Sequence, residues 1–144
     1  MSIEQSFPHL RSTGYRVTSP STPYYNCIAW AADEDNRWWE PDPFGLYYWP
    51  ESSPRQRTLE AYMQAFISLG YTPCNTDELE QGFEKIALYV DPQSIPTHAA
   101  KQLSNGRWTS KLGQLEDIEH TLEGLKNSIY GSVAQVLRRP AAGS

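Results

Sequence analysis

The stretch that decides the fold is YNCIAWA, residues 25–31, in which an asparagine and a cysteine open a short apolar run. Asn26 is a favoured residue for a helix N-cap, because its side-chain oxygen can accept a free N–H of the first turn. The polar residues 33–36 then end the run. The pattern predicts a short helix that begins after Asn26, with Cys27 in its first turn.

Two further segments follow this helix. Residues 37–50 read RWWEPDPFGLYYWP and hold six aromatic residues among three prolines and a glycine. Prolines forbid a regular helix there, so we expect a long ordered loop. Residues 56–69 have apolar side chains at helical spacing, with Thr58 as a suitable cap and Gly70 as a suitable stop. The sequence therefore predicts a second helix over 56–69.

The second half of the chain has the pattern of strands. Residues 85–90, 98–103, 107–112 and 132–137 are β-prone, and Asn105-Gly106 is a strong hairpin signal. Residues 120–130 can form a short helix capped by Thr121, and Pro140 closes the last strand. Helices followed by an antiparallel sheet predict an α+β fold. The expected organisation is an N-terminal arm over 1–23, one domain over 24–139 and a tail over 140–144.

Composition narrows the function classes. The net charge of −5 and the scattered Lys and Arg argue against nucleic acid as a partner. There is no run of roughly 18 apolar residues, so we expect no membrane span. The first residues lack the pattern of a secretory signal, which indicates the cytoplasm and leaves export by a dedicated machine open. No cofactor is expected, and no metal site either, because the two cysteines lack a paired short spacing.

Cys27 and His98 are the candidate catalytic pair. A helix N-terminus can lower the pKa of a thiol, and its free N–H groups can hold a developing oxyanion. His98 is flanked by small residues at the start of a predicted strand, and it lies 98 − 27 = 71 positions after Cys27. Such a pair can meet only through the fold, as nucleophile and base commonly do. The simpler alternatives are a buried cysteine that only packs and a histidine that only forms hydrogen bonds.

The motifs NCIAWA and HAA, in this order, resemble those of the papain-like cysteine hydrolases, especially the compact NlpC/P60 and CHAP-like branch. The string GRWTSKLG at 106–113 and the motif DIEH at 117–120 also look like those of an uncharacterised bacterial family of small proteins. The resemblance covers residues 24 to about 138. It implies a cysteine-bearing helix packed on an antiparallel sheet.

The resemblance also implies a third polar residue that orients the histidine ring. Asp117 is the stronger expectation, since a carboxylate stabilises an imidazolium, and Ser110 is the other. Asn26 can cap the helix or donate to an oxyanion, and Tyr25 can place a hydroxyl near the site or only pack. A substrate groove is expected to use the aromatic side chains of Trp30, Trp38, Trp39 and Trp108. The acidic residues around the loop could match a basic partner, although a solvated acidic face is commoner.

The resulting expectation is a thiol hydrolase that cleaves an amide bond. The bond could lie in a peptide, a peptidoglycan stem peptide or a protein glutamine side chain. The alternative is a catalytically inactive papain-like module that binds a partner protein through its aromatic loop. Rapid alkylation of Cys27 well below pH 8 would favour the hydrolase.

Overall fold

The computed structural model describes residues 3–112, 116–125 and 129–141, and it has one antiparallel sheet with short helices around it. The seven strands lie in the order β1-β6-β5-β4-β3-β7-β2. Their bounds are β1 (Tyr15–Ser19), β2 (Thr72–Cys74), β3 (Phe83–Val90), β4 (Pro96–Gln102), β5 (Trp108–Lys111), β6 (Asp117–His120) and β7 (Ser132–Pro140). The helices are α1 (Ile3–Ser6), α2 (Leu10–Thr13), α3 (Cys27–Ala31), α4 (Leu59–Ile67) and α5 (Leu122–Leu125). The chain is therefore α+β, as the sequence predicts.

The predicted local signals lie at the ends of these elements. Asn26 is the N-cap of α3 and accepts the Ala29 N–H, while Thr58 caps α4 in the same way. Gly70 adopts a φ of 97° after α4, a conformation that glycine tolerates better than other residues. The residues 103–107 connect β4 to β5 around the predicted Asn105-Gly106 turn.

The first 23 residues differ from the predicted arm. They contain α1, α2 and the edge strand β1, which pairs with β6 through Tyr15↔His120 and Val17↔Ile118. β6 and β2 were also not predicted as strands. Of the expected helix over 120–130, the structure forms α5, and residues 126–128 lie outside the described part of the chain. β7 runs to Pro140, and of the predicted tail the residues 142–144 are likewise outside it.

Each face of the sheet has its own hydrophobic cluster, since successive side chains of a strand point to opposite faces. The first face carries α3 and α4, and Leu88 and Ala99 belong to its cluster together with Ile28 and Phe66. The second face carries Ala87, Tyr89, Ala100, Ile118 and Val136, which pack against the first two helices and α5 through Phe7, Leu10, Leu122 and Leu125.

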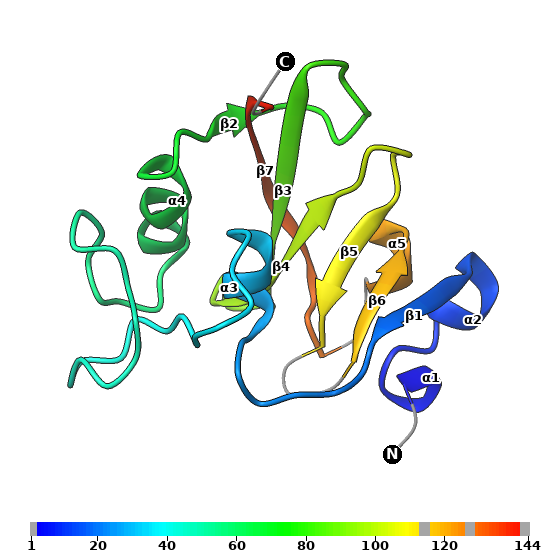
Figure 1. The fold of residues 1–144 in the computed structure, drawn as a ribbon, viewed down its shortest axis with the longest axis horizontal. Coiled ribbons are helices and arrows are strands. Elements are labelled where there is room, and N and C mark those ends of the chain that lie inside the picture. Colours follow the sequence, from blue (N-terminus) through cyan, green and yellow to red (C-terminus); the bar gives the residue numbers. More distant parts are fainter. Residues whose placement is uncertain (1–2, 113–115, 126–128, 142–144) are drawn as a thin grey trace.

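Figure 1 shows α3 in front of β4, near the middle of the sheet, with α4 to one side. The long loop between α3 and α4 extends beyond α4, and α1 and α2 lie at the opposite end beside β1. No helix among the described residues is long and apolar enough to cross a membrane. Cys27 and Cys74 are both free thiols.

Candidate functional site

Cys27 lies at the bottom of a pocket beside the start of β4. The pocket has a volume of about 190 Å³, and the cysteine that opens onto it is 9% exposed. Its walls include the aromatic rings of Trp38, Trp39, Tyr62 and Tyr130. At the rim Arg57 forms an ion pair with Glu40 at 3.1 Å. A volume of this size is below that of a typical small-molecule site and suits a single side chain or a small acyl group.

Asn26 joins the helix to the aromatic loop. Its Oδ1 accepts the N–H groups of Ala29 at 3.1 Å and Trp39 at 3.2 Å, and its Nδ2 donates to the Trp39 carbonyl at 2.7 Å. The side chain therefore caps α3 and fixes the loop wall above Cys27 at the same time. These bonds give Asn26 the capping role, one of the two roles expected for it.

Burial dominates the electrostatics of the Cys27 sulfur. It raises the pKa of the thiol to about 11, against the opposing effects of the Ala99 and Ile28 N–H groups and of the Lys111 charge. The predicted lowering of the pKa by the helix start is thus outweighed, since α3 has five residues and the sulfur is removed from water. Cys27 is a neutral thiol at pH 7 in this conformation.

A chain of hydrogen bonds runs from His98 across β5 to β6. His98 Nε2 lies 2.8 Å from Ser110 Oγ, and the same oxygen lies 2.7 Å from His120 Nε2. His120 Nδ1 lies 2.6 Å from the Thr121 carbonyl oxygen. His98, Ser110 and His120 are all fully buried.

This chain fixes the proton positions of the two neutral rings. The Thr121 carbonyl can only accept, so His120 Nδ1 carries a proton and its Nε2 is an acceptor. Ser110 then donates to His120, and Ser110 Oγ accepts from His98 Nε2–H. His98 Nδ1 is left as an unprotonated nitrogen, and it has no hydrogen-bond partner within the described residues. Such a nitrogen can take up a proton and act as a general base.

The two members of the predicted pair lie on opposite sides of β4. Cys27 belongs to the cluster of Ala99, whereas the ring of His98 contacts Tyr89 and stacks on Tyr130 at 4.0 Å between centroids. Neither ring nitrogen of His98 bonds to Cys27: Nδ1 has no partner among the described residues, and Nε2 lies at Ser110 Oγ. The N–H of Ala99, the residue after His98, acts on the Cys27 sulfur. Tyr130 lines the pocket of Cys27 and covers the ring of His98.

The buried histidines predict a loss of stability in acid. Burial lowers the pKa of His98 well below its ordinary value of 6.5 and that of His120 to about 4. The unfolded chain therefore binds more protons below pH 6.5, and the free energy of unfolding falls as the pH drops toward 4. Between pH 7 and pH 5 we expect a decrease of about 2 kcal/mol from His120 and a further decrease from His98.

Urea unfolding at the two pH values measures this change. The His120→Gln variant should lose less stability than the wild type over the same interval, by about 2 kcal/mol. An equal loss in both proteins would contradict the assignment of the effect to these rings.

Asp117 does not orient His98, contrary to the stronger of the two expectations. Its Oδ2 accepts the hydroxyl of Tyr25 at 2.6 Å, on the face of the sheet that carries α3. Lys111 of β5 is opposite Asp117 of β6 in the strand register, and its Nζ lies 5.3 Å from the Tyr25 ring centroid. Ser110 is the residue that contacts His98. Asp117 of β6 pairs with Lys111, the neighbour of Ser110 on β5, so Asp117 faces the side of the sheet opposite Ser110.

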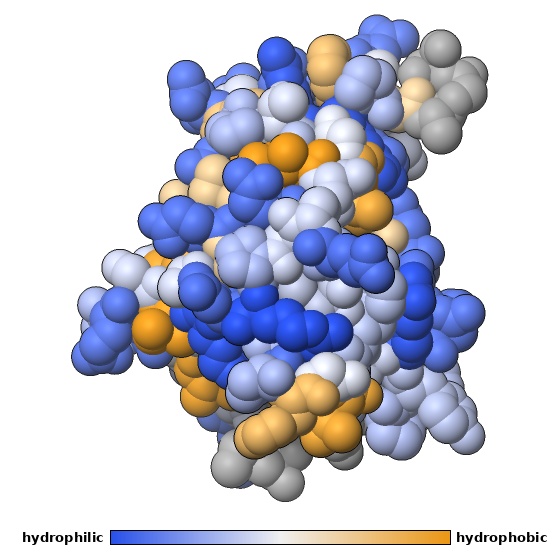
Figure 2. All heavy atoms as spheres, turned by 90° about the vertical axis from the view of Figure 1, so that its left-hand side faces the viewer, coloured by the Kyte–Doolittle hydropathy of each residue, from blue (hydrophilic) through white to orange (hydrophobic). Residues whose placement is uncertain are grey.

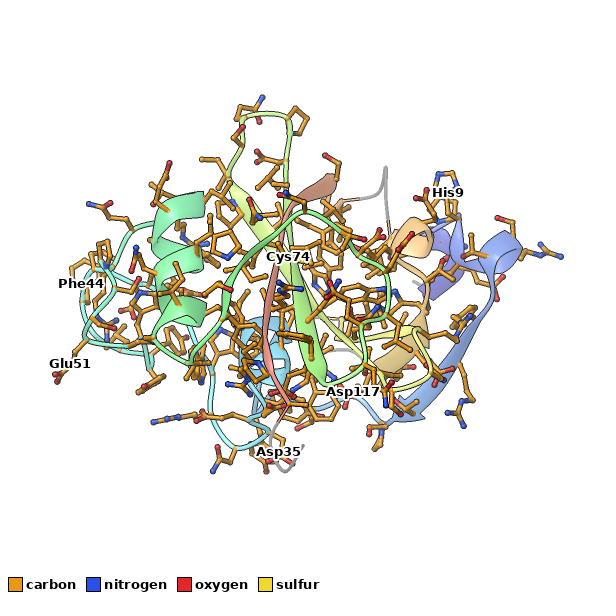
Figure 3. The ribbon with its side chains drawn as sticks, turned by 90° about the horizontal axis from the view of Figure 1, so that it is seen from above. His9, Asp35, Phe44, Glu51, Cys74 and Asp117 are labelled. Atoms are coloured by element: carbon orange, nitrogen blue, oxygen red, sulfur yellow. The ribbon has the colours of Figure 1, made fainter. Side chains whose placement is uncertain are left out.

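The predicted aromatic groove is only partly formed. Trp38 and Trp39 line the pocket of Cys27. Trp30 instead donates its Nε1–H to Thr109 Oγ1 at 3.0 Å, and Trp108 packs in the hydrophobic cluster of the second face. His9, the third histidine, lies at the end of the molecule opposite Phe44 and Glu51, at the outer loop (Figure 3).

Most acidic side chains near the loop have basic partners, which reduces the predicted negative field. The ion pairs are Glu34 with Arg37, Glu40 with Arg57, Asp42 with Arg55, and Asp33 with Lys101 and Arg139. No group of three or more His, Cys, Asp or Glu side chains in the described segments is placed to hold a metal ion.

Comparison with known proteins identifies a family, but no similar curated protein and no similar solved structure. Residues 16–138 match the family model described as a domain of unknown function, DUF7689. No curated protein and no solved structure matches the chain.

Proposed function

The chain belongs to the DUF7689 family, and we propose that it is a papain-like thiol hydrolase of amide bonds with Cys27 as nucleophile and His98 as base. The observation that carries the proposal is a cysteine that lines a pocket whose wall includes Tyr130, the ring that stacks on a histidine with a free acceptor nitrogen. Peptides, peptidoglycan stem peptides and protein glutamine side chains all present the bond that this chemistry cleaves.

The Cys27 thiol and the His98 imidazole are both neutral before substrate binds, so the proton must move as the sulfur attacks. Burial raises the pKa of Cys27 and lowers that of His98, so a preformed thiolate–imidazolium pair is disfavoured. His98 Nδ1 takes the thiol proton as the sulfur attacks the carbonyl carbon. It returns that proton to the leaving amine, and water then releases the acyl group from Cys27.

The step requires the sulfur and His98 Nδ1 to come within hydrogen-bond distance. Catalytic hydrogen bonds are often long before substrate binds and shorten in the complex. The start of β4 is suited to this change, because its pairing with β3 shifts register between Tyr89 and Val90. The ladder between β4 and β5 is formed at Lys101↔Thr109 and Gln102↔Trp108, toward the other end of β4.

Acylation by p-nitrophenyl acetate tests the proposal, because the acetyl group is small enough for the pocket. At pH 7.5 we expect Cys27 to be acetylated at least tenfold faster than Cys74, which is more exposed and serves as the internal control. His98→Gln should slow Cys27 by about 10²-fold, the usual contribution of a general base, and leave Cys74 unchanged.

Mass spectrometry of the intact protein and of its peptides measures both sites. Acetylation of Cys27 no faster than that of Cys74, or unaffected by His98→Gln, would overturn the proposal. Alkylation by iodoacetamide should be slow at pH 7, because the raised pKa of Cys27 leaves little thiolate for a reagent that gives the base no role. The sequence alone led us to expect rapid alkylation of Cys27 below pH 8; with the raised pKa of the buried thiol we expect slow alkylation.

The second candidate function is a binding module without catalysis. It is favoured by the exposed side chains of Phe44 and Leu46, which are 84% and 77% exposed on the long loop. Phe44 lies at the outer end of that loop (Figure 3). On the side of the molecule shown in Figure 2, however, apolar atoms form separate patches among hydrophilic ones. The acylation experiment decides between the two functions.

A further inference from the structure

We propose that His120 is a positioning residue that shares, through Ser110, the proton taken up by His98. The inference rests on the proposed function for the role of His98 as a base, whereas the sharing of the proton can be measured without any substrate. Three hydrogen bonds, from His98 to Ser110, Ser110 to His120 and His120 to Thr121, carry it.

The sharing is a shift of two protons along existing hydrogen bonds. When His98 Nδ1 takes up a proton, its Nε2 proton moves to Ser110 Oγ as the Ser110 hydroxyl proton moves to His120 Nε2. His98 is then neutral with its proton on Nδ1, Ser110 donates to His98 Nε2, and His120 carries the positive charge. The reverse shift returns a proton to His98 Nε2 and the charge to the His98 ring, which can then release the proton on Nδ1, so no other reactant is needed.

The surroundings of the two rings favour placing the charge on His120. Both N–H groups of a charged His120 have acceptors, Ser110 Oγ and the Thr121 carbonyl. Burial and the charge of Arg107 oppose a positive charge on His120, whereas the Thr121 carbonyl and the charge of Glu119 favour it. His98 is surrounded by the rings of Tyr89 and Tyr130, and Cys27 lies on the far side of β4. A charge retained on His98 would have less compensation in that environment.

His120→Gln separates orientation from proton sharing. A glutamine oxygen can still accept the Ser110 hydroxyl, so His98 keeps its Nε2 proton, but an amide cannot take up the charge. Ser110→Ala is the second variant and removes the connection itself. A spectrum of the backbone amides shows whether each variant is folded.

The measurement is ¹⁵N NMR of the imidazole nitrogens, over the pH range in which the amide spectrum remains that of the folded chain. In the wild type at pH 7 we expect His98 Nδ1 and His120 Nε2 to be unprotonated, and the two rings to titrate with one shared midpoint. In His120→Gln the midpoint of His98 should fall by one pH unit or more, a tenfold loss of proton affinity. In Ser110→Ala the rings should titrate independently.

Three results would overturn proton sharing: a proton on His98 Nδ1 at pH 7, an equal His98 midpoint in wild type and His120→Gln, or no change in either wild-type ring before unfolding. Failure of the hydrolase proposal is recognised separately, as Cys27 acetylation that does not depend on His98.

Discussion

Gly131→Ala is expected to lower the free energy of unfolding by about 3 kcal/mol or more, through overpacking and backbone strain together. A Cβ atom at this position would lie 2.0 Å from the Val90 carbonyl oxygen and 3.1 Å from Asp91 Cα. Both contacts are with backbone, so no side chain can move aside. The residue also has a φ of +77°, which disfavours alanine.

Gly45→Ala is the matched control for this prediction. Gly45 has a φ of +71°, but a Cβ there has nothing within 4 Å, so only the cost of the left-handed conformation remains, about 1–2 kcal/mol. Urea unfolding of both variants measures the difference. If Gly131→Ala is no less stable than Gly45→Ala, the backbone around Gly131 can shift to accommodate a Cβ atom, which would contradict the prediction.

The position of Gly131 links this stability to the site. Tyr130, the preceding residue, stacks on His98, and its backbone carbonyl accepts the hydroxyl of Thr97 at 2.5 Å. Thr97 and Tyr130 both line the pocket of Cys27. The tight approach of Gly131 to β3 therefore helps to hold the ring that stacks on His98 and lines the pocket of Cys27.

The elements that the sequence predicts correctly are those specified by neighbouring residues. A cap such as Asn26 or Thr58 acts within one turn, and the Asn105-Gly106 turn needs only its own conformation. The strands β1 and β6 depend on each other instead. β1 is half-exposed with no clear alternation, and the four residues of β6 include buried Asp117 and His120. Asp117 and His120 are polar, so the sequence does not predict a buried strand there. Their side chains form hydrogen bonds with residues far away in the sequence.

The site shows the same division. Asn26, Cys27, Trp38 and Trp39 are close in sequence and line one pocket, whereas Trp30, which lies between them in the chain, does not line it. The face on which His98 lies could not be predicted, because Ala99 and Ala100 give no difference in hydrophobicity between the two sides of β4.

His120 was not among the predicted site residues, because it precedes a predicted helix and has acidic neighbours in the sequence. The signal that could have found it is register: Trp108 and Ser110 alternate with exposed-type residues just as Ile118 and His120 do. Two strands with that pattern, paired antiparallel, place the hydroxyl and the ring on one face.

Trp39→Ala should cost about 3–5 kcal/mol of stability, the range for truncating a buried aromatic residue. Trp39 is 2% exposed, its ring meets those of Tyr48 and Trp49 edge-on, and its Nε1 donates to Glu34 at 2.7 Å. Loss of the ring leaves a cavity where the aromatic loop meets α3, next to the pocket. The neighbouring Trp38 is half-exposed, so Trp38→Ala should cost about 1 kcal/mol and is the matched control.

The same two variants separate the stability of the loop from its role in binding. Asn26 holds the backbone of Trp39 and not its side chain, so the cap of α3 survives either substitution. If Trp38 contacts the acyl group of a substrate, Trp38→Ala should slow Cys27 acetylation while the urea midpoint changes little. Trp39→Ala should lower both together, because the wall of the pocket collapses with the core. Equal stabilities for the two variants would contradict the view that Trp39 anchors the loop.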